Sequence, residues 1–288
     1  DRSDTYNPFY NTSPTVAKDM LINMTDWSEE HYKVNAERYL QRLISLMNKA
    51  EIPLSFQSIV KFMELDNFTL LSTQLVKEKQ ISKERHLENL EIAKTSGKVA
   101  ENSIARFSTI AESELGEIFS DTGIDIATAL KEKAIILFIL NPLIYPELSP
   151  AFGRLVLIDS KKAISQRFQN QKRTFFLFDE INVYASKTLI DLVNKSRSAN
   201  VTCVLATQSL SDLASAEDED FTQQIIENCN NYLVLRQNSA VNSENWANIL
   251  GTRQTMEVTY QLQQKGLDTT QTLSLIHISE PTRPISIS

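Results

Sequence analysis

Hydrophobic and polar positions follow two different patterns along this chain, and the change comes near residue 125. From about residue 15 to 120, apolar residues recur every three to four positions, which is the spacing of one face of an α-helix. The clearest stretch is 31–50, "HYKVNAERYLQRLISLMNKA", whose apolar stripe comprises Tyr32, Ala36, Tyr39, Leu40, Leu43, Ile44 and Met47. No alternating strand pattern interrupts this region, so the sequence predicts an all-helical unit.

Three local features complete the prediction for this helical region. Asp66 is a suitable N-cap for the helix in "NFTLLSTQLVKEK", and the apolar spacing predicts a single helix over 101–119. The stretch "SGKV" contains a Gly-Lys dipeptide, but a phosphate-binding P-loop requires GxxxxGK[ST]. Ile92 and Val99 stand where that motif needs Gly and Ser or Thr, so we predict a turn between helices here.

Beyond Asp125, short apolar runs alternate with helical patterns. The run "AIILFIL" at 134–140 is typical of a strand that is buried on both faces. Further strands are predicted at 174–180, 201–208 and 232–236, and helices at 149–168, 186–198, 221–228 and 240–250. Ser149 and Pro150 are suited to the N-cap and N1 positions, and Gly251 to the position after a helix end. Such alternation predicts an α/β fold with a mostly parallel sheet and helices on its faces.

Polar residues follow the predicted strands where each one ends. Asp179 and Glu180 end "TFFLFDE", Thr207 and Gln208 end "VTCVLATQ", and Arg236 ends "YLVLR". Because parallel strands all end at one edge of the sheet, where ligands bind, we expect these residues to be neighbours.

This set of residues is suited to phosphoryl transfer to water. Mg²⁺ prefers oxygen ligands, and Asp179 is placed to hold it directly or through water. Glu180 would polarise the attacking water, and Gln208 would sense or orient the γ-phosphate. Arg197, at the end of the next predicted helix, could act as an arginine finger on the nucleotide of a neighbouring subunit.

Each of these residues also has an ordinary structural interpretation. An Asp-Glu pair after an apolar strand arises by chance, and Gln208 can simply neighbour a helix N-cap. Arg197 can be a solvated cation that the helix dipole favours. We keep the strand-end interpretation for Arg236. The acids, the amide and the arginine are more specific in combination, because they occur in this order and with these gaps.

Composition narrows the function classes. The chain has 288 residues, 42% of them hydrophobic, and a net charge of −7, which argues mildly against a surface built to coat nucleic acid. It does not argue against a local basic loop. Cys203 and Cys229 are interpreted as free thiols in a reducing cytosol. The three histidines are far apart and show no metal-ligand spacing, and no apolar run reaches the length of a membrane span.

The stretch "FFLFDEINVYASKTLIDLVNKSRSANVTCVLATQSLSDL" resembles the motor domain of TraD/TraG-type conjugative coupling proteins. "IIENCNNYLVLRQNSAVNSENWANILGTRQT", "SDTYNPF" and "WSEEHYKVNAERYLQ" resemble the same family. The resemblance implies a RecA-like, additional-strand P-loop ATPase with an inserted all-helical subdomain. The implied division is core at 1–14, helical subdomain at 15–122 and the Walker B half of the core at 123–272.

The resemblance also implies roles and partners. Asp179 and Glu180 match the Walker B acids, with Asp179 towards Mg²⁺, and Gln208 matches the glutamine motif beside Thr207 in the nucleotide site. Arg197 matches the arginine in the helix after Walker B. The implied protein is a homo-hexamer that hydrolyses ATP and drives single- or double-stranded DNA, with its relaxase, towards a type IV secretion channel. It would be anchored at the cytoplasmic face of the bacterial inner membrane.

Two departures from the family pattern concern the ends of the chain. No P-loop is present, and the chain does not begin with Met, so we expect it to be cut from a longer protein and to bind nucleotide poorly by itself. The stretch 273–283, "LSLIHISEPTR", resembles the translated adapter of a sequencing library. Residues 273–288 are therefore expected to be non-native.

Two other functions remain open at this point. One is a related motor with another cargo, such as a HerA/FtsK-like translocase or a pilus-assembly ATPase. The other is a non-catalytic interaction protein that keeps the RecA-like fold, and the intact Asp179 and Glu180 argue against it.

Overall fold

The computed structural model describes residues 3–27, 29–114, 116–166, 173–253 and 280–281. The helices before the first strand are α1 (Pro14–Asn23), α2 (Glu30–Lys49), α3 (Phe56–Met63), α4 (Leu65–Lys77), α5 (Lys83–Ile92), the π-helix η1 (Ala93–Gly97), α6 (Glu101–Ala111), the 3₁₀ turn η2 (Gly116–Ile118), α7 (Ile126–Glu132) and α8 (Leu148–Ser165). The elements after them are β1 (Thr174–Phe178), the 3₁₀ turn η3 (Ile181–Tyr184), α9 (Lys187–Ser196), the 3₁₀ turn η4 (Arg197–Ala199), β2 (Val201–Leu205), α10 (Leu210–Ala216), α11 (Glu219–Asn228), α12 (Ala240–Leu250), β3 (Thr252–Arg253) and β4 (Glu280–Pro281).

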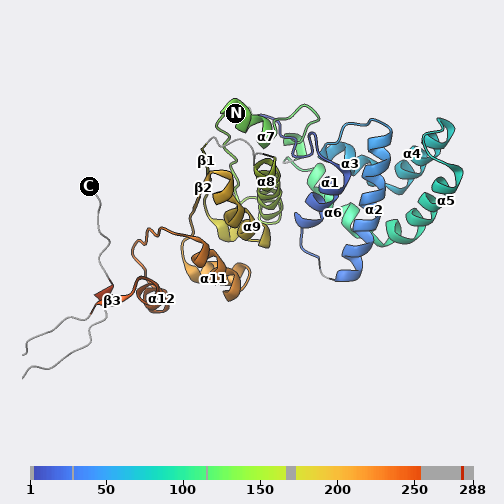
Figure 1. Ribbon diagram of the computed structural model, residues 1–288. Helices are drawn as coiled ribbons and strands as arrows, with labels where there is room; N and C mark the ends of the chain where they lie inside the picture. Colours follow the sequence, from blue (N-terminus) through green and yellow to red (C-terminus); the bar gives the residue numbers. More distant parts are fainter. Residues whose placement is uncertain (1–2, 28, 115, 167–172, 254–279, 282–288) are drawn as a thin grey trace, which may run out of the picture.

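Helices α1 to α7 share one apolar core and form the helical unit; α1 to α6 lie towards one end of the molecule and α7 lies beside α8 (Figure 1). The predicted apolar stripe of α2 lies in the core of the helical unit, because Tyr39, Leu43 and Met47 are buried. Tyr32, at the start of the helix, is exposed. The ring of Tyr39 lies 5.0 Å from that of Phe68 on α4. Regular apolar spacing therefore did predict which face of the helix packs inward.

Three local predictions in the helical unit were wrong. Asp66 lies in the first turn of α4 rather than at its N-cap, which is Glu64. The helix predicted over 101–119 ends at Ala111, because the next segment turns to pair with Tyr6, whose N–H donates to the Ile118 carbonyl at 2.7 Å. "SGKV" is no turn, since η1 continues through Gly97.

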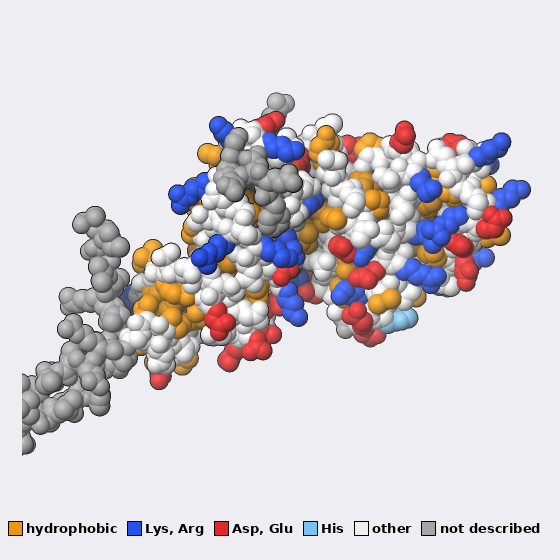
Figure 2. All heavy atoms as spheres, viewed as in Figure 1, with side chains coloured by type: hydrophobic (Ala, Val, Ile, Leu, Met, Phe, Trp, Pro, Cys, Tyr) orange, Lys and Arg blue, Asp and Glu red, His pale blue; other side chains and the backbone are white. Residues whose placement is uncertain are grey.

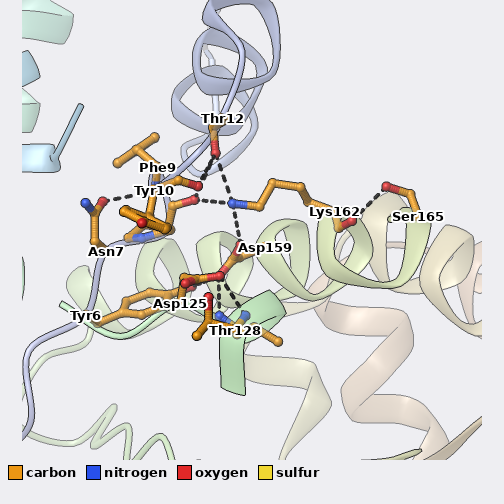
Figure 3. Close-up of polar contacts among 12 residues, drawn as sticks. Tyr6, Asn7, Phe9, Tyr10, Thr12, Asp125, Thr128, Asp159, Lys162 and Ser165 are labelled. Carbon is orange, nitrogen blue, oxygen red and sulfur yellow. Dashed lines mark hydrogen bonds and ion pairs between the residues drawn. The ribbon is translucent and has the colours of Figure 1, made fainter. Parts of the chain in front are cut away.

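Helix α8 lies between the helical unit and the strands and packs on both (Figure 1). Its charged residues bind the N-terminal segment in an arrangement that we call the Asp159 clasp (Figure 3). Asp159 is fully buried; it accepts a 2.8 Å hydrogen bond from the Tyr6 hydroxyl and pairs with Lys162 at 2.8 Å. Lys162 Nζ also donates to the Pro8 carbonyl at 2.6 Å and to Thr12 Oγ1 at 3.0 Å. The clasp thus ties the start of the chain to α8.

The start and end of α8 differ slightly from the prediction. The helix begins at Leu148 with Glu147 as its N-cap, so Ser149 and Pro150 lie inside the first turn rather than at the N-cap and N1. Proline is tolerated there because first-turn N–H groups have no partner within the helix. The helix ends at Ser165, and Phe168 lies outside the described residues.

The strands β1 and β2 pair in parallel, with Thr174 opposite Val201 and Phe178 opposite Leu205. Helix α9 connects them, and α8 and α9 cover the sheet face that carries Phe176 and Phe178. These elements, with α10 and α11, form the sheet unit, whose core includes Leu157, Leu189 and Leu192. A parallel pair joined through a helix confirms the α/β arrangement in this part of the chain.

Two predicted strands do not join this sheet. Within the described residues, neither 134–140 nor 232–236 pairs with another strand. The run at 134–140 is extended and packs Ile136, Phe138 and Leu140 against the helical core. Its alternate residues are bare, with Ile135 98% exposed. The prediction of burial on both faces was therefore wrong, because a second layer does not cover this segment within the described residues.

The other face of β1 and β2 is also bare, with Phe175, Leu177 and Val204 exposed. Beyond the sheet unit, apolar side chains gather on the surface over α12 (Figure 2), where Val241, Ile249 and Leu250 are exposed. No helix in the described part of the chain is long and apolar enough to cross a membrane.

Candidate functional site

The two predicted acids lie in a tight turn directly after β1, which we call the acid turn and define as residues 179–184. Both acidic side chains are exposed. Glu180 has a left-handed backbone, with φ of 47°, which is uncommon for a residue other than Gly. Its N–H donates to Asp179 Oδ1 at 2.9 Å, and this bond orients the Asp179 carboxylate. The turn therefore presents two carboxylates side by side at the end of a strand.

The turn is joined to the end of β2 by backbone and side-chain bonds. The Ala206 N–H donates to the Phe178 carbonyl at 2.8 Å, and the Ile181 N–H donates to the Ala206 carbonyl at 3.1 Å. Two residues further on, Gln208 Nε2 donates to Glu180 Oε1 at 3.4 Å. The structure thus brings Glu180 and Gln208 together, as the parallel-strand argument predicted.

Thr207 lies between Ala206 and Gln208 in the sequence and is half-buried. Its hydroxyl donates to the Ser209 carbonyl at 3.2 Å, which leaves its oxygen lone pairs available to a donor. The two predicted arginines lie elsewhere. The segment around Arg236 is not a strand, so the argument that placed Arg236 at this edge does not hold.

Arg197 lies at the opposite end of the parallel pair. It is in η4, just before β2 begins at Val201, whereas the acids follow the last residue of β1. A five-residue strand is about 16 Å long, so Arg197 cannot reach the acid turn of its own chain. Its side chain is exposed, and within the described residues it makes no ion pair.

A buried tyrosine supports the acid turn from behind. The Tyr184 hydroxyl donates to the Asp179 backbone carbonyl at 2.7 Å. Its ring lies against α8 at Gly153, where an added Cβ would be 2.7 Å from Tyr184 Cβ and Cγ. Burial, followed by the negative charges of Asp179 and Glu180, raises the pKa of the Tyr184 phenol, so the hydroxyl remains a proton donor at neutral pH.

The carboxylates are suited to a metal that is shared with a ligand. In the described part of the chain, no three His, Cys, Asp or Glu residues gather as a metal site. Mg²⁺, however, commonly takes one or two carboxylates and completes its shell with water and substrate phosphates. An exposed Asp179 carboxylate, already oriented by the Glu180 N–H, suits that kind of site.

The comparisons with known proteins identify the family. Residues 10–281 match the model of the type IV secretion-system coupling protein DNA-binding domain. The chain belongs to this family. It is a TraD/TraG-type coupling protein sequence, as the motif resemblance indicated. No protein among the curated sequences matches it.

Solved structures of the coupling protein TrwB share the fold of this chain. An unbound bacterial conjugative coupling protein, TrwBdeltaN70, superposes with a TM-score of 0.52 at 13% identity, covering 79% of this chain and 53% of its own. TrwB with ADP and Mg²⁺ gives 0.53 at 14%, covering 79% and 55%. TrwB with a non-hydrolysable ATP analogue gives 0.54 at 14%, again covering 79% and 55%. This coupling protein chain therefore spans about half the length of the structures that it matches.

Sequence reasoning missed the residues behind the acid turn. In the sequence, Tyr184 is an aromatic residue shortly after the acids, and Gly153 is a small residue within a predicted helix. Neither residue by itself predicts a functional role. No local pattern joins them, because the contact links residues 31 positions apart. An aromatic residue five positions after the first acid is the only signal in the sequence.

Proposed function

We propose that this chain provides the Walker B half of the ATPase core in a conjugative coupling protein, together with its helical subdomain. The observation that carries the proposal is the acid turn at the carboxyl end of β1, with Gln208 against Glu180. Family membership and the nucleotide complexes of TrwB support it. The complete core would be RecA-like, with residues 1–14 and 123–272 in the core and 15–122 as the inserted subdomain.

Each residue at this edge has a proposed part in hydrolysis. Asp179 would hold Mg²⁺, which neutralises charge on the ATP phosphates. Glu180 would polarise the attacking water, and Gln208, already bonded to Glu180, would keep that carboxylate in place and respond to the γ-phosphate. Thr207 would contribute its oxygen to the nucleotide site.

Arg197 would act on the nucleotide of another subunit. Its position at the opposite end of the strands prevents it from serving the acids of its own chain. A subunit arrangement that brings one copy's η4 to the next copy's acid turn would supply the cation that phosphoryl transfer requires. This geometry supports a ring, and we take the homo-hexamer from the family resemblance.

The proposed cargo and partners follow from the family. The ring would move single- or double-stranded DNA, with its relaxase, towards a type IV secretion channel at the cytoplasmic face of the inner membrane. The family model describes a DNA-binding domain. A HerA/FtsK-like translocase or a pilus-assembly ATPase would use the same acids with another cargo, and would lack dependence on a relaxase.

The first experiment tests the acids. In the longest product of the gene that carries this chain, Glu180→Gln should lower the kcat of ATP hydrolysis at least about a hundredfold, the scale of a lost general base. Glu227→Gln is the matched control, because Glu227 is also exposed and accepts a 3.0 Å bond from a glutamine, Gln223. Unchanged turnover in Glu180→Gln would support the non-catalytic alternative.

The second experiment tests Arg197 between subunits. Arg197→Ala alone should be inactive, with a loss on the order of a thousandfold, while Lys195→Ala at the same helix end should not. Mixing Arg197→Ala subunits with Glu180→Gln subunits should restore part of the activity, since one interface then has both groups. Failure to recover any activity in mixed rings would contradict action between subunits.

A further inference from the structure

Backbone bonds hold the acid turn at its start and in its middle, and a tyrosine side chain bonds to its first residue. Its start is fixed by the Ala206–Phe178 backbone bond and its middle by the Ile181–Ala206 bond. Within the turn, the Val183 N–H donates to the Glu180 carbonyl at 2.9 Å, and the Tyr184 hydroxyl reaches back five residues to the Asp179 carbonyl. Between these points lies the left-handed Glu180, a conformation that persists only where the surroundings hold it.

The Tyr184 contact is partly buried although the acids themselves are exposed. Tyr184 is 8% exposed, so water competes little for its hydroxyl. The bond to Asp179 acts on the peptide that joins Asp179 to Glu180. Rotation of that peptide would redirect both carboxylates together, since one precedes it and the other follows it.

Gly153 allows this contact. At this position of α8, any Cβ would lie 2.7 Å from Tyr184 Cβ and Cγ, closer than real Cβ atoms approach. A larger residue would therefore push the tyrosine ring away from α8 and lengthen the bond to Asp179. The same helix carries Asp159 and Lys162 of the clasp one to three turns further on, so the support of the ring is itself fixed.

We propose that Tyr184 is a positioning residue for ATP hydrolysis, and that Gly153 supplies the space in which it acts. Tyr184 sets the direction of the Asp179 and Glu180 carboxylates through the peptide between them, without touching the nucleotide. The inference rests on the proposed function of the acid turn. It assigns a role to two residues outside the set of acids, amide and arginine.

The chain offers a closely matched control in the helical unit. The buried Tyr39 hydroxyl also donates to a backbone carbonyl, that of Met63, at 2.7 Å. Its ring also packs on a glycine, Gly97, where an added Cβ would lie 3.0 Å from Tyr39 Cε2 and 2.6 Å from Leu65 Cδ2. Tyr39→Phe and Gly97→Ala thus remove the same kind of bond and add the same kind of overlap, far from the acids.

The kinetic test compares the two pairs in the longest gene product. Tyr184→Phe and Gly153→Ala should each lower kcat about tenfold to a hundredfold, the cost of a small misplacement of reacting groups. The KM for ATP should change less than about twofold, because nucleotide contacts remain. Tyr39→Phe and Gly97→Ala should leave kcat unchanged. Equal kcat in Tyr184→Phe and Tyr39→Phe would overturn the proposal.

An exchange measurement on the 288-residue chain tests the positioning itself. In Tyr184→Phe, amide hydrogen exchange of the peptide that covers 179–185 should be about fivefold faster, the factor for one hydrogen bond of about 1 kcal/mol. Exchange elsewhere should not change. Unaltered exchange there would overturn the positioning role. If the unmodified protein hydrolyses no ATP, the proposed function is wrong, and so is the role of Tyr184 in hydrolysis. The exchange result then tests only whether Tyr184 holds the acid turn.

Discussion

The helical unit and the sheet unit bury their apolar residues to very different extents. Phe56 and Phe68 in the helical unit are fully buried, whereas Phe175 and Leu177 on β1 are 54% and 75% exposed. The apolar residues of α1 to α7 form one core together with Ala151, Phe152 and Leu155 of α8. The parallel strands β1 and β2 are covered on one face only, although parallel sheets are normally covered on both. The helical unit is thus closed, and the sheet unit presents an apolar face to solvent.

Both units contain the same kind of tyrosine–glycine contact, but it joins different elements in each. In both, a buried tyrosine donates its hydroxyl to a backbone carbonyl and packs its ring on a glycine. In the helical unit the pair joins α2 to the end of α3 and to η1, which is a packing role. In the sheet unit it joins α8 to the exposed acid turn. The same kind of hydrogen bond therefore has different consequences in the two units. The Tyr39 bond joins packed helices, whereas the Tyr184 bond orients the exposed acids.

The largest expected effect tests whether the difference in burial persists in solution. Phe56→Ala should lower the free energy of unfolding by about 3–5 kcal/mol, the usual cost of a large cavity. Leu177→Ala should change it by less than about 0.5 kcal/mol, as for other surface positions. Urea unfolding followed by circular dichroism measures both. A Leu177→Ala cost close to that of Phe56→Ala would show that the sheet face is covered after all.

The next effect concerns the Asp159 clasp, which joins the two units through α8. Lys162→Met should cost about 3 kcal/mol, because it leaves the buried Asp159 carboxylate without its cation. Lys161→Met is the control; Lys161 pairs with Asp191 at the surface, and such pairs contribute less than about 1 kcal/mol. Urea unfolding of both variants at neutral pH makes the comparison. Similar costs for the two lysines would show that the clasp adds little.

The pH dependence of this variant has a definite sign. Burial raises the pKa of Asp159, and Lys162 and the Tyr6 hydroxyl oppose that rise. A carboxyl with a raised folded-state pKa favours folding below its unfolded value of about 4, and that contribution is lost as pH rises through the folded pKa. Without Lys162 the folded pKa rises further. The cost of Lys162→Met should therefore shrink as the pH is lowered, and a cost that grows on acidification would contradict this account.

A smaller effect compares helix caps in the two units. Ser55 forms a reciprocal capping box with Ser58 at the start of α3, so Ser55→Ala should cost about 1 kcal/mol. Ser186 precedes α9 but makes no side-chain cap bond, and its buried hydroxyl has no hydrogen-bond partner within the described residues. Ser186→Ala should therefore cost nothing measurable in thermal unfolding. A loss of about 1 kcal/mol there would reveal a bond to a group outside those residues.

The stripe of α2 and the approach of Glu180 to Gln208 were both predictable from the sequence, for two different physical reasons. Helical spacing depends on neighbours within a few residues, so the stripe of α2 was readable. The approach of Glu180 and Gln208 followed from the parallel order of β1 and β2 alone. Strands β1 and β2 end at Phe178 and Leu205, before the predicted ends at residues 180 and 208. The chain enters the acid turn directly after β1, and it leaves the strand conformation at Ala206 after β2.

Most other contacts between distant residues could not be predicted from the sequence. The runs at 134–140 and 232–236 have strand composition, yet pairing requires a neighbouring strand, which the described residues do not provide. The Gly153–Tyr184 contact and the clasp between Tyr6 and Asp159 likewise join separate segments. Residues 254–279 and 282–288 lie outside the described residues, so the non-native origin of 273–288 stays a prediction.

The smallest expected change in stability tests the bare segment at 134–140. The triple variant Ile135→Thr, Leu137→Thr and Ile139→Thr keeps residues that tolerate an extended backbone and alters only exposed side chains. Its free energy of unfolding should change by less than about 1 kcal/mol, while binding of an apolar-surface dye and self-association in sedimentation should fall.

The neighbouring inward position supplies the control for this triple variant. Ile136 packs on the helical core, so Ile136→Thr alone should cost about 1–3 kcal/mol, the penalty for placing a hydroxyl in an apolar contact. If three outward substitutions cost more than this single inward one, the outward face must be covered in solution. The segment 134–140 would then be buried on both faces, as its composition predicted.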